Sequence, residues 1–139
     1  MLYSKFVELY DKIASTTKKL EKIEILSEFL KYLSKNGESE WIYLLRGKIL
    51  PDYDSREMGI SDQIISKVIS SSYGIKEKDV TEKFRKVGDW GEIAYTFSEK
   101  RKQNVLFSKK LEVEKVFSNL RAILDIEGKG AIDRKVKNI

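Results

Sequence analysis

Apolar residues recur at helical spacing along almost the whole chain, and no segment alternates convincingly between apolar and polar positions as a half-buried strand would. In the first run, for example, Leu2, Phe6, Leu9 and Ile13 fall on one face of a helix. Similar runs cover residues 17–36, 39–46, 61–73, 76–86, 90–103, 112–125 and 131–139. Glycines stand near most of the breaks, where they suit helix ends. The spacing predicts an all-α fold of about eight short helices.

Length and composition narrow the class of protein. A chain of 139 residues with 41% apolar residues predicts one compact domain, residues 1–139, with a real core. The absence of cysteine and histidine excludes a disulfide framework, thiol chemistry, His-based acid–base catalysis and the usual zinc sites. No apolar run is long enough to span a membrane, and the N-terminus does not resemble a signal peptide. We expect a cytoplasmic protein without a membrane partner.

The positive charge is concentrated in the last third of the chain. Residues 1–99 hold 16 basic and 17 acidic residues, a net charge of −1, whereas residues 100–139 hold 11 basic and 5 acidic residues, a net charge of +6. A local basic excess favours polyanions, because binding them releases counterions. The alternative is ordinary solubilising charge.

Two similar glycine turns precede predicted helices. Gly59-Ile60-Ser61-Asp62 and Gly130-Ala131-Ile132-Asp133 both fit the pattern G-x-x-D-x-x-[IV], and each follows a helix with an aliphatic end. The pattern predicts two related helix–glycine turn–helix units, with chance similarity as the alternative. Ser61 or Asp62 can cap the helix that follows. The free N–H groups and the dipole at such a helix start favour an anion.

Basic residues flank both turns. Arg46, Lys48 and Arg56 surround the first, and Lys129, Arg134, Lys135 and Lys137 surround the second. Phosphate is often held by a helix N-terminus together with a nearby Arg or Lys. Because a duplex has two backbones, two such turns could hold both across a groove.

Three segments, in order and at the right spacing, carry a family resemblance. They are LRGKILPDYDSREMGI at residues 45–60, GDWGEIA at 88–94, and the closing part from residue 101 to 139. Together with the first 30 residues, they resemble the N-terminal DNA-binding domain of archaeal and eukaryotic ATP-dependent DNA ligases. The resemblance implies an all-helical domain with internal pseudo-twofold symmetry that binds the minor groove on both sides of a nick.

The resemblance also implies which residues face DNA. This set, extended by neighbouring basic and turn residues, is Arg46, Lys48, Arg56, Gly59, Ile60, Ser61, Gly128, Lys129, Gly130, Arg134 and Lys135. The sequence departs from the family's pattern at one point, where Ala131 and Ile132 replace a pair that is usually small and polar. Backbone contacts to phosphate would survive that change, but side-chain contacts would not.

The parent ligase would join DNA in replication, repair and recombination through AMP intermediates, using ATP and Mg²⁺. Its catalytic lysine lies in a K-x-D-G motif, which this sequence lacks. We therefore expect no catalytic residue and no cofactor in this chain, and we expect the natural polypeptide to continue beyond Ile139. The role of the chain would be to bind duplex DNA and position the nick.

A second implied site is a short box that binds a sliding clamp. Gln103, Leu106 and Phe107 fit its pattern of a glutamine followed by a hydrophobic–aromatic pair. Docking to a clamp is the alternative function for the chain. Equally, Leu106 and Phe107 could simply anchor their loop to the core.

For two further groups of residues we expect a structural role rather than a functional one. Asp52, Asp54 and Glu57 lie among basic residues without the spacing of a calcium loop, so we expect no metal there. Trp41, Trp90 and the tyrosines at helical spacing are predicted to lie in the core.

Overall fold

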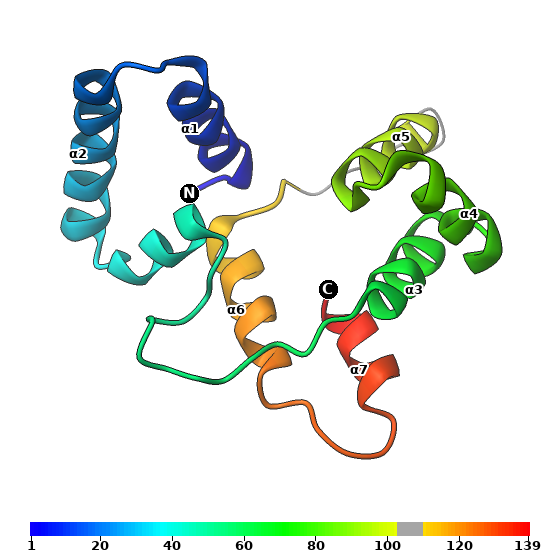
Figure 1. Ribbon diagram of the computed structural model, residues 1–139. Helices are drawn as coiled ribbons and strands as arrows, with labels where there is room; N and C mark the ends of the chain where they lie inside the picture. The colour runs from blue at the N-terminus through cyan, green and yellow to red at the C-terminus, as the bar shows by residue number, and fades with distance from the viewer. Residues whose placement is uncertain (103–109) are drawn as a thin grey trace. The chain divides into compact units, whose positions relative to one another are not determined.

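The structure is a computed structural model that describes residues 1–102 and 110–139, without the side chains of residues 101 and 102. The described residues form seven α-helices and one 3₁₀ helix, and no strand among them (Figure 1). In chain order the elements are α1 (Tyr3–Ser15), α2 (Lys19–Asn36), η1 (Ser39–Arg46), α3 (Asp62–Tyr73), α4 (Glu77–Val87), α5 (Trp90–Lys102), α6 (Val113–Ile123) and α7 (Ala131–Asn138). The all-α prediction is confirmed.

Most helix ends lie where local sequence signals predict them. Gly37, Gly47, Gly74 and Gly88 follow the ends of α2, η1, α3 and α4. Asp89 accepts a hydrogen bond from the N–H of Glu92 at 2.8 Å, which supports the start of α5. The 3₁₀ helix η1 begins at Ser39 itself, and the preceding residue, Glu38, makes no side-chain cap.

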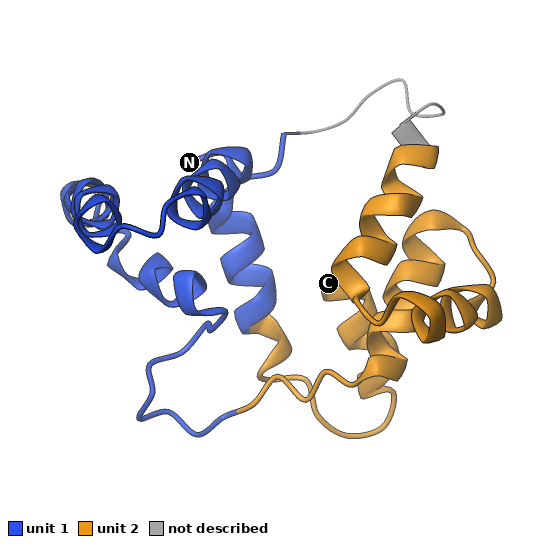
Figure 2. Ribbon diagram, turned by 45° about the horizontal axis from the view of Figure 1, so that its top comes forward, with its two compact units in different colours: residues 1–56, 110–121 blue, residues 57–109, 122–139 orange. Residues whose placement is uncertain are grey.

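The chain divides into two compact units, coloured separately in Figure 2. Unit 1 comprises residues 1–56 and 110–121, and unit 2 comprises residues 57–109 and 122–139. Each unit therefore combines an early segment with a later one. The prediction of one domain over residues 1–139 stays a prediction.

Aromatic packing organises the core of unit 1. Phe6 is fully buried and meets Phe29 edge-on, with ring centroids 5.5 Å apart. A second edge contact, at 5.1 Å, joins Phe6 to Tyr10 on the same helix. The segment before α6 is tied to the N-terminus, since the N–H of Tyr3 donates to the carbonyl of Leu111 at 2.8 Å. The remaining buried side chains are Leu33, Trp41, Leu44, Ile49, Val113 and Phe117.

Unit 2 has a core of its own, built by α3, α4 and α5. Its buried cluster is Ile69, Val80, Ile93 and Phe97. Fully burying an aliphatic side chain contributes roughly 1.5–3 kcal/mol, so this cluster accounts for much of what holds the three helices together. The fourth helix of the unit, α7, packs against α3 (Figure 1).

The core predictions for aromatic residues are confirmed only in part. Trp41 is buried, but Trp90 is half-buried and stacks on Phe84 with ring centroids 3.9 Å apart. Tyr95 is 65% exposed and Tyr32 is 40% exposed, so the prediction is wrong for both. Helical spacing does not distinguish core from surface for tyrosine, whose hydroxyl can remain in water.

No described helix is both long and apolar enough to cross a membrane.

Candidate nucleic-acid interface

The first glycine turn leads directly into α3. Gly59 has a φ of +57°, a backbone conformation that residues with a side chain rarely adopt. Ser61 follows in an extended conformation as the N-cap, and its Oγ accepts a hydrogen bond from the N–H of Ile64 at 3.4 Å. The serine cap predicted from the sequence is therefore confirmed. Asp62 instead accepts a hydrogen bond from the indole N–H of Trp90, at 2.9 Å.

The second turn leads into α7 in a different register. Gly130 is itself the N-cap of α7, and no side chain caps the helix. The N–H of Ala131 donates to the carbonyl of Gly128 at 3.1 Å and closes the turn. The aspartates of the shared pattern therefore differ in position: Asp62 is the first residue of α3, whereas Asp133 is the third of α7. The internal repeat stays a prediction.

Arg134 folds back on the turn that precedes it. Its Nη2 donates to the carbonyl of Glu127 at 2.6 Å and lies 3.5 Å from the carbonyl of Lys129. The guanidinium thus stabilises the turn by donating to backbone carbonyls of the turn itself. Lys129, by contrast, is exposed, and its ammonium makes no hydrogen bond or ion pair with any described residue.

Lys135 links the two turns. Its Nζ donates to the carbonyl of Met58 at 2.7 Å and to the carbonyl of Gly59 at 3.3 Å. A Cβ added at Gly59 would lie 3.0 Å from this Nζ. Both predicted turns belong to unit 2, so the structure brings together residues that are more than 70 positions apart in sequence.

The predicted basic residues of the first loop belong to unit 1, and carboxylates engage them. Arg46 Nη1 donates to Asp52 Oδ2 at 2.6 Å, and Lys48 Nζ donates to Asp52 Oδ1. These two hydrogen bonds, that of Lys48 first, hold the pKa of Asp52 below its ordinary value. Asp52 therefore stays ionised at neutral pH and competes with any phosphate for both cations.

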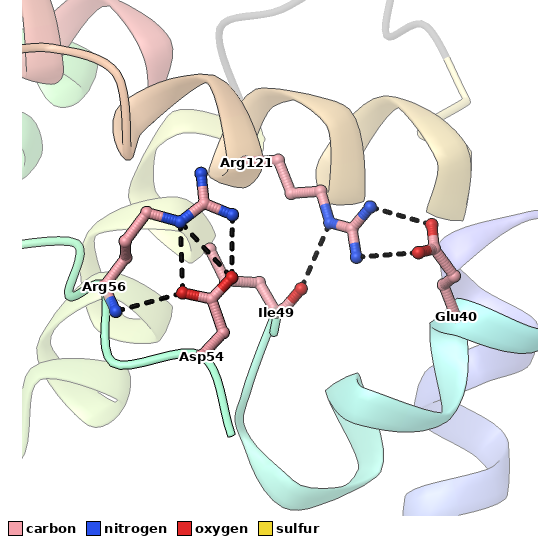
Figure 3. A network of polar contacts seen from close by, with 5 residues as sticks. All are labelled: Glu40, Ile49, Asp54, Arg56 and Arg121. Atoms are coloured by element: carbon pink, nitrogen blue, oxygen red, sulfur yellow. Dashed lines mark hydrogen bonds and ion pairs between the residues drawn. The ribbon is translucent and has the colours of Figure 1, made fainter. Parts of the chain in front are cut away.

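Arg56 is engaged in the same way by Asp54 (Figure 3). Its Nη2 lies 2.8 Å from Oδ2 and its Nε lies 3.1 Å from Oδ1. The hydrogen bonds from the guanidinium, and then from the backbone N–H of Arg56, lower the pKa of Asp54. Both Asp52 and Asp54, which were considered above as metal ligands, are thus engaged by basic side chains.

No local pattern in the sequence indicates the role of Arg121. This residue of α6 donates to the carbonyl of Ile49 at 3.1 Å and pairs with Glu40 through both terminal nitrogens, at 2.7 and 3.1 Å (Figure 3). Its guanidinium also lies 4.4 Å from the ring centre of Phe117. Arg121 of α6 therefore binds both Glu40 of η1 and Ile49, which lies at the start of the loop that follows η1. Its partners lie 72 and 81 positions away, beyond the reach of any local pattern.

The family described as DNA ligase N terminus matches residues 2–139. The chain belongs to this family.

The curated relatives of this ligase N-terminal chain include archaeal proteins named DNA ligase. One from Methanosphaera stadtmanae is 41% identical over 138 residues, covering 96% of the chain and 25% of the relative. Another from Nanoarchaeum equitans is 36% identical and one from Thermococcus onnurineus is 31% identical, covering 98% and 99% of the chain and 24% of each relative. The chain spans about a quarter of the length of these relatives.

Two predictions about this ligase N-terminal chain remain open. Gln103, Leu106 and Phe107 lie outside the described residues, so the clamp-binding box stays a prediction. Among the residues that the structure does describe, no group of three His, Cys, Asp or Glu side chains could hold a metal ion.

Proposed function

We propose that this chain binds duplex DNA through the phosphate backbone and positions nicked DNA for an ATP-dependent DNA ligase of which it is the N-terminal part. The observation that carries the proposal is the linked pair of glycine turns in unit 2, in a chain that matches the ligase N terminus over residues 2–139. The relatives' shared name, DNA ligase, supports DNA as the partner.

The chemistry of the turns favours backbone contacts. The first N–H groups of α3 have no acceptor within their own helix, and the positive end of the helix dipole lies there. Two exposed ammonium groups are added by Lys129 in the second turn and by Lys137 in the last turn of α7. Backbone amides and ammonium groups read charge and shape rather than base edges, so binding with little sequence preference follows.

The catalytic part of the proposal lies outside this chain. ATP, Mg²⁺ and the K-x-D-G lysine would belong to the remaining three quarters of the parent ligase, and joining the nick would be its reaction in replication, repair and recombination. This chain would hold the duplex without itself catalysing a step, in the cytoplasm.

The proposal is tested by titrating labelled duplexes, intact and nicked, with the chain and following fluorescence anisotropy across a series of salt concentrations. We expect affinity to fall steeply between low and physiological salt, and to be similar for unrelated sequences. Affinity that is independent of salt would contradict the phosphate-backbone mode. Affinity confined to particular sequences would require base readout instead.

A pair of charge variants locates the interface. Changing Lys129 and Lys137 to Gln removes two exposed charges that make no hydrogen bond or ion pair in the described part of the chain. We expect the magnitude of the salt slope to fall by about 2, one for each phosphate that a lysine no longer neutralises. The matched control changes Lys76 and Lys78, two exposed lysines near the opposite end of α3, and should leave the slope unchanged.

A further inference from the structure

Lys135 differs from the other basic residues around the second turn. Lys129, Arg134 and Lys137 are exposed, whereas Lys135 is half-buried and reaches across to the chain before α3. Its ammonium donates to two backbone carbonyls, those of Met58 and Gly59. An ammonium has three N–H donors and no acceptor, so at most one donor remains for anything else.

Binding these carbonyls fixes the orientation of two peptide planes. The backbone contains no cis peptide bond among the described residues, and a trans peptide points its C=O and its N–H in opposite directions. When Lys135 draws the carbonyls of Met58 and Gly59 toward α7, the N–H groups of Gly59 and Ile60 therefore point away from the lysine. Neither N–H has an acceptor among the described residues.

The same interaction removes an obstacle to an anion. Carbonyl oxygens carry partial negative charge and repel phosphate when they face it. Lys135 holds two of them on the side away from the N–H groups of Gly59 and Ile60 and partly neutralises them. Gly59 allows the ammonium of Lys135 to approach this closely, because a Cβ at Gly59 would lie 3.0 Å from that ammonium.

We propose that Lys135 is a positioning residue for DNA binding, which holds the Gly59 turn so that the N–H groups of Gly59 and Ile60 face a phosphate. The proposal rests on the proposed function and changes the role of Lys135 within it. In this role Lys135 does not touch phosphate itself, unlike the exposed lysines Lys129 and Lys137.

The salt slope separates a positioning lysine from a phosphate ligand. Changing Lys135 to Met removes the ammonium but keeps most of the apolar stem. We expect affinity for duplex DNA to fall by about three- to tenfold with the salt slope unchanged, because the ammonium of Lys135 neutralises no phosphate. Lys137→Met, on the same helix, should reduce the magnitude of the slope by about 1.

Amide chemical shifts follow the turn directly and do not depend on DNA. In the chain without DNA, Lys135→Met should move the NMR signals of Gly59 and Ile60, whereas Lys137→Met should leave them in place. Lys135→Arg, which keeps a donor to the two carbonyls, should restore much of the affinity. Circular dichroism establishes that each variant keeps its helices.

Two results would overturn the assignment. If Lys135→Met reduces the magnitude of the slope by about 1 and leaves the Gly59 and Ile60 signals in place, Lys135 is a phosphate ligand. If it moves those signals and leaves affinity unchanged, the interaction is structural only. Failure of the proposed function looks different, because the unchanged chain then shows no salt-dependent binding to any duplex.

Discussion

Gly59 is constrained twice, by its backbone angle and by the lysine that approaches its Cα. A φ of +57° is strained for any residue with a Cβ, and Lys135 Nζ lies only 3.0 Å from the position that such a Cβ would take. Gly74, which follows α3, has a similar φ of +67°, but a Cβ at Gly74 would have no atom within 4 Å. A substitution at either glycine would therefore strain the backbone to a similar extent, but only a substitution at Gly59 would also disturb Lys135.

Gly59→Ala should lower the free energy of unfolding by more than Gly74→Ala. Each substitution costs roughly 1 kcal/mol in backbone strain, and Gly59→Ala also makes Lys135 Nζ shift, which weakens hydrogen bonds worth about 0.5–1.5 kcal/mol. Urea unfolding of both variants measures the difference. In a Lys135→Met background the two costs should become equal, and a difference that persists there would show that the lysine is not its cause.

At the scale of elements, the first loop differs from the two turns of unit 2 in how its cations are used. Arg46 and Lys48 share Asp52, and Arg56 pairs with Asp54, all within six positions in sequence. These pairs are mostly exposed, and such pairs are weak. The loop therefore holds its cations in ion pairs that a phosphate can replace at little cost.

Asp52→Asn should strengthen binding to duplex DNA. Removing this carboxylate releases Arg46 and Lys48, so we expect affinity at low salt to rise by about two- to fivefold and the salt slope to become steeper. Fluorescence anisotropy across a salt series measures both quantities. Asp11→Asn on α1 is the control for a change of one charge, because its carboxylate makes no hydrogen bond or ion pair with a described residue. Equal effects of the two substitutions would show that Arg46 and Lys48 do not meet DNA.

At the scale of the molecule, each compact unit buries apolar residues of its own. Phe6 in unit 1 and Ile93 in unit 2 are both fully buried. Leu20 in α2 belongs to the helical pattern of apolar residues yet is 80% exposed. The buried residues of α2, Phe29 and Leu33, lie in the second half of the helix.

Phe6→Ala and Ile93→Ala should destabilise different units. We expect losses of about 3–5 and 2–5 kcal/mol, and hydrogen exchange should show the largest loss of protection in the unit that carries the substitution. Leu20→Ala serves as the surface control, with a change within about 0.5 kcal/mol. Equal loss of protection in both units would instead support the single cooperative domain expected from chain length.

Local interactions explain which features are predictable. The helix ends at Gly74 and Gly88 and the cap at Ser61 depend on residues within one helical turn, so their signals are visible in the sequence. The family resemblance is also a property of order and spacing along the chain, and the match over residues 2–139 confirms it. The sequence by itself therefore determined the all-α class, most helix boundaries and the ligase family.

Only the tertiary structure decided how the basic residues are used. Lys135 meets carbonyls that lie 76 and 77 positions away, and Arg121 meets partners 72 and 81 positions away. Before folding, a lysine that holds a turn and a lysine that projects into water have the same sequence signature. Their roles separate only when packing places an acceptor beside one of them, as α3 and α7 do for Lys135.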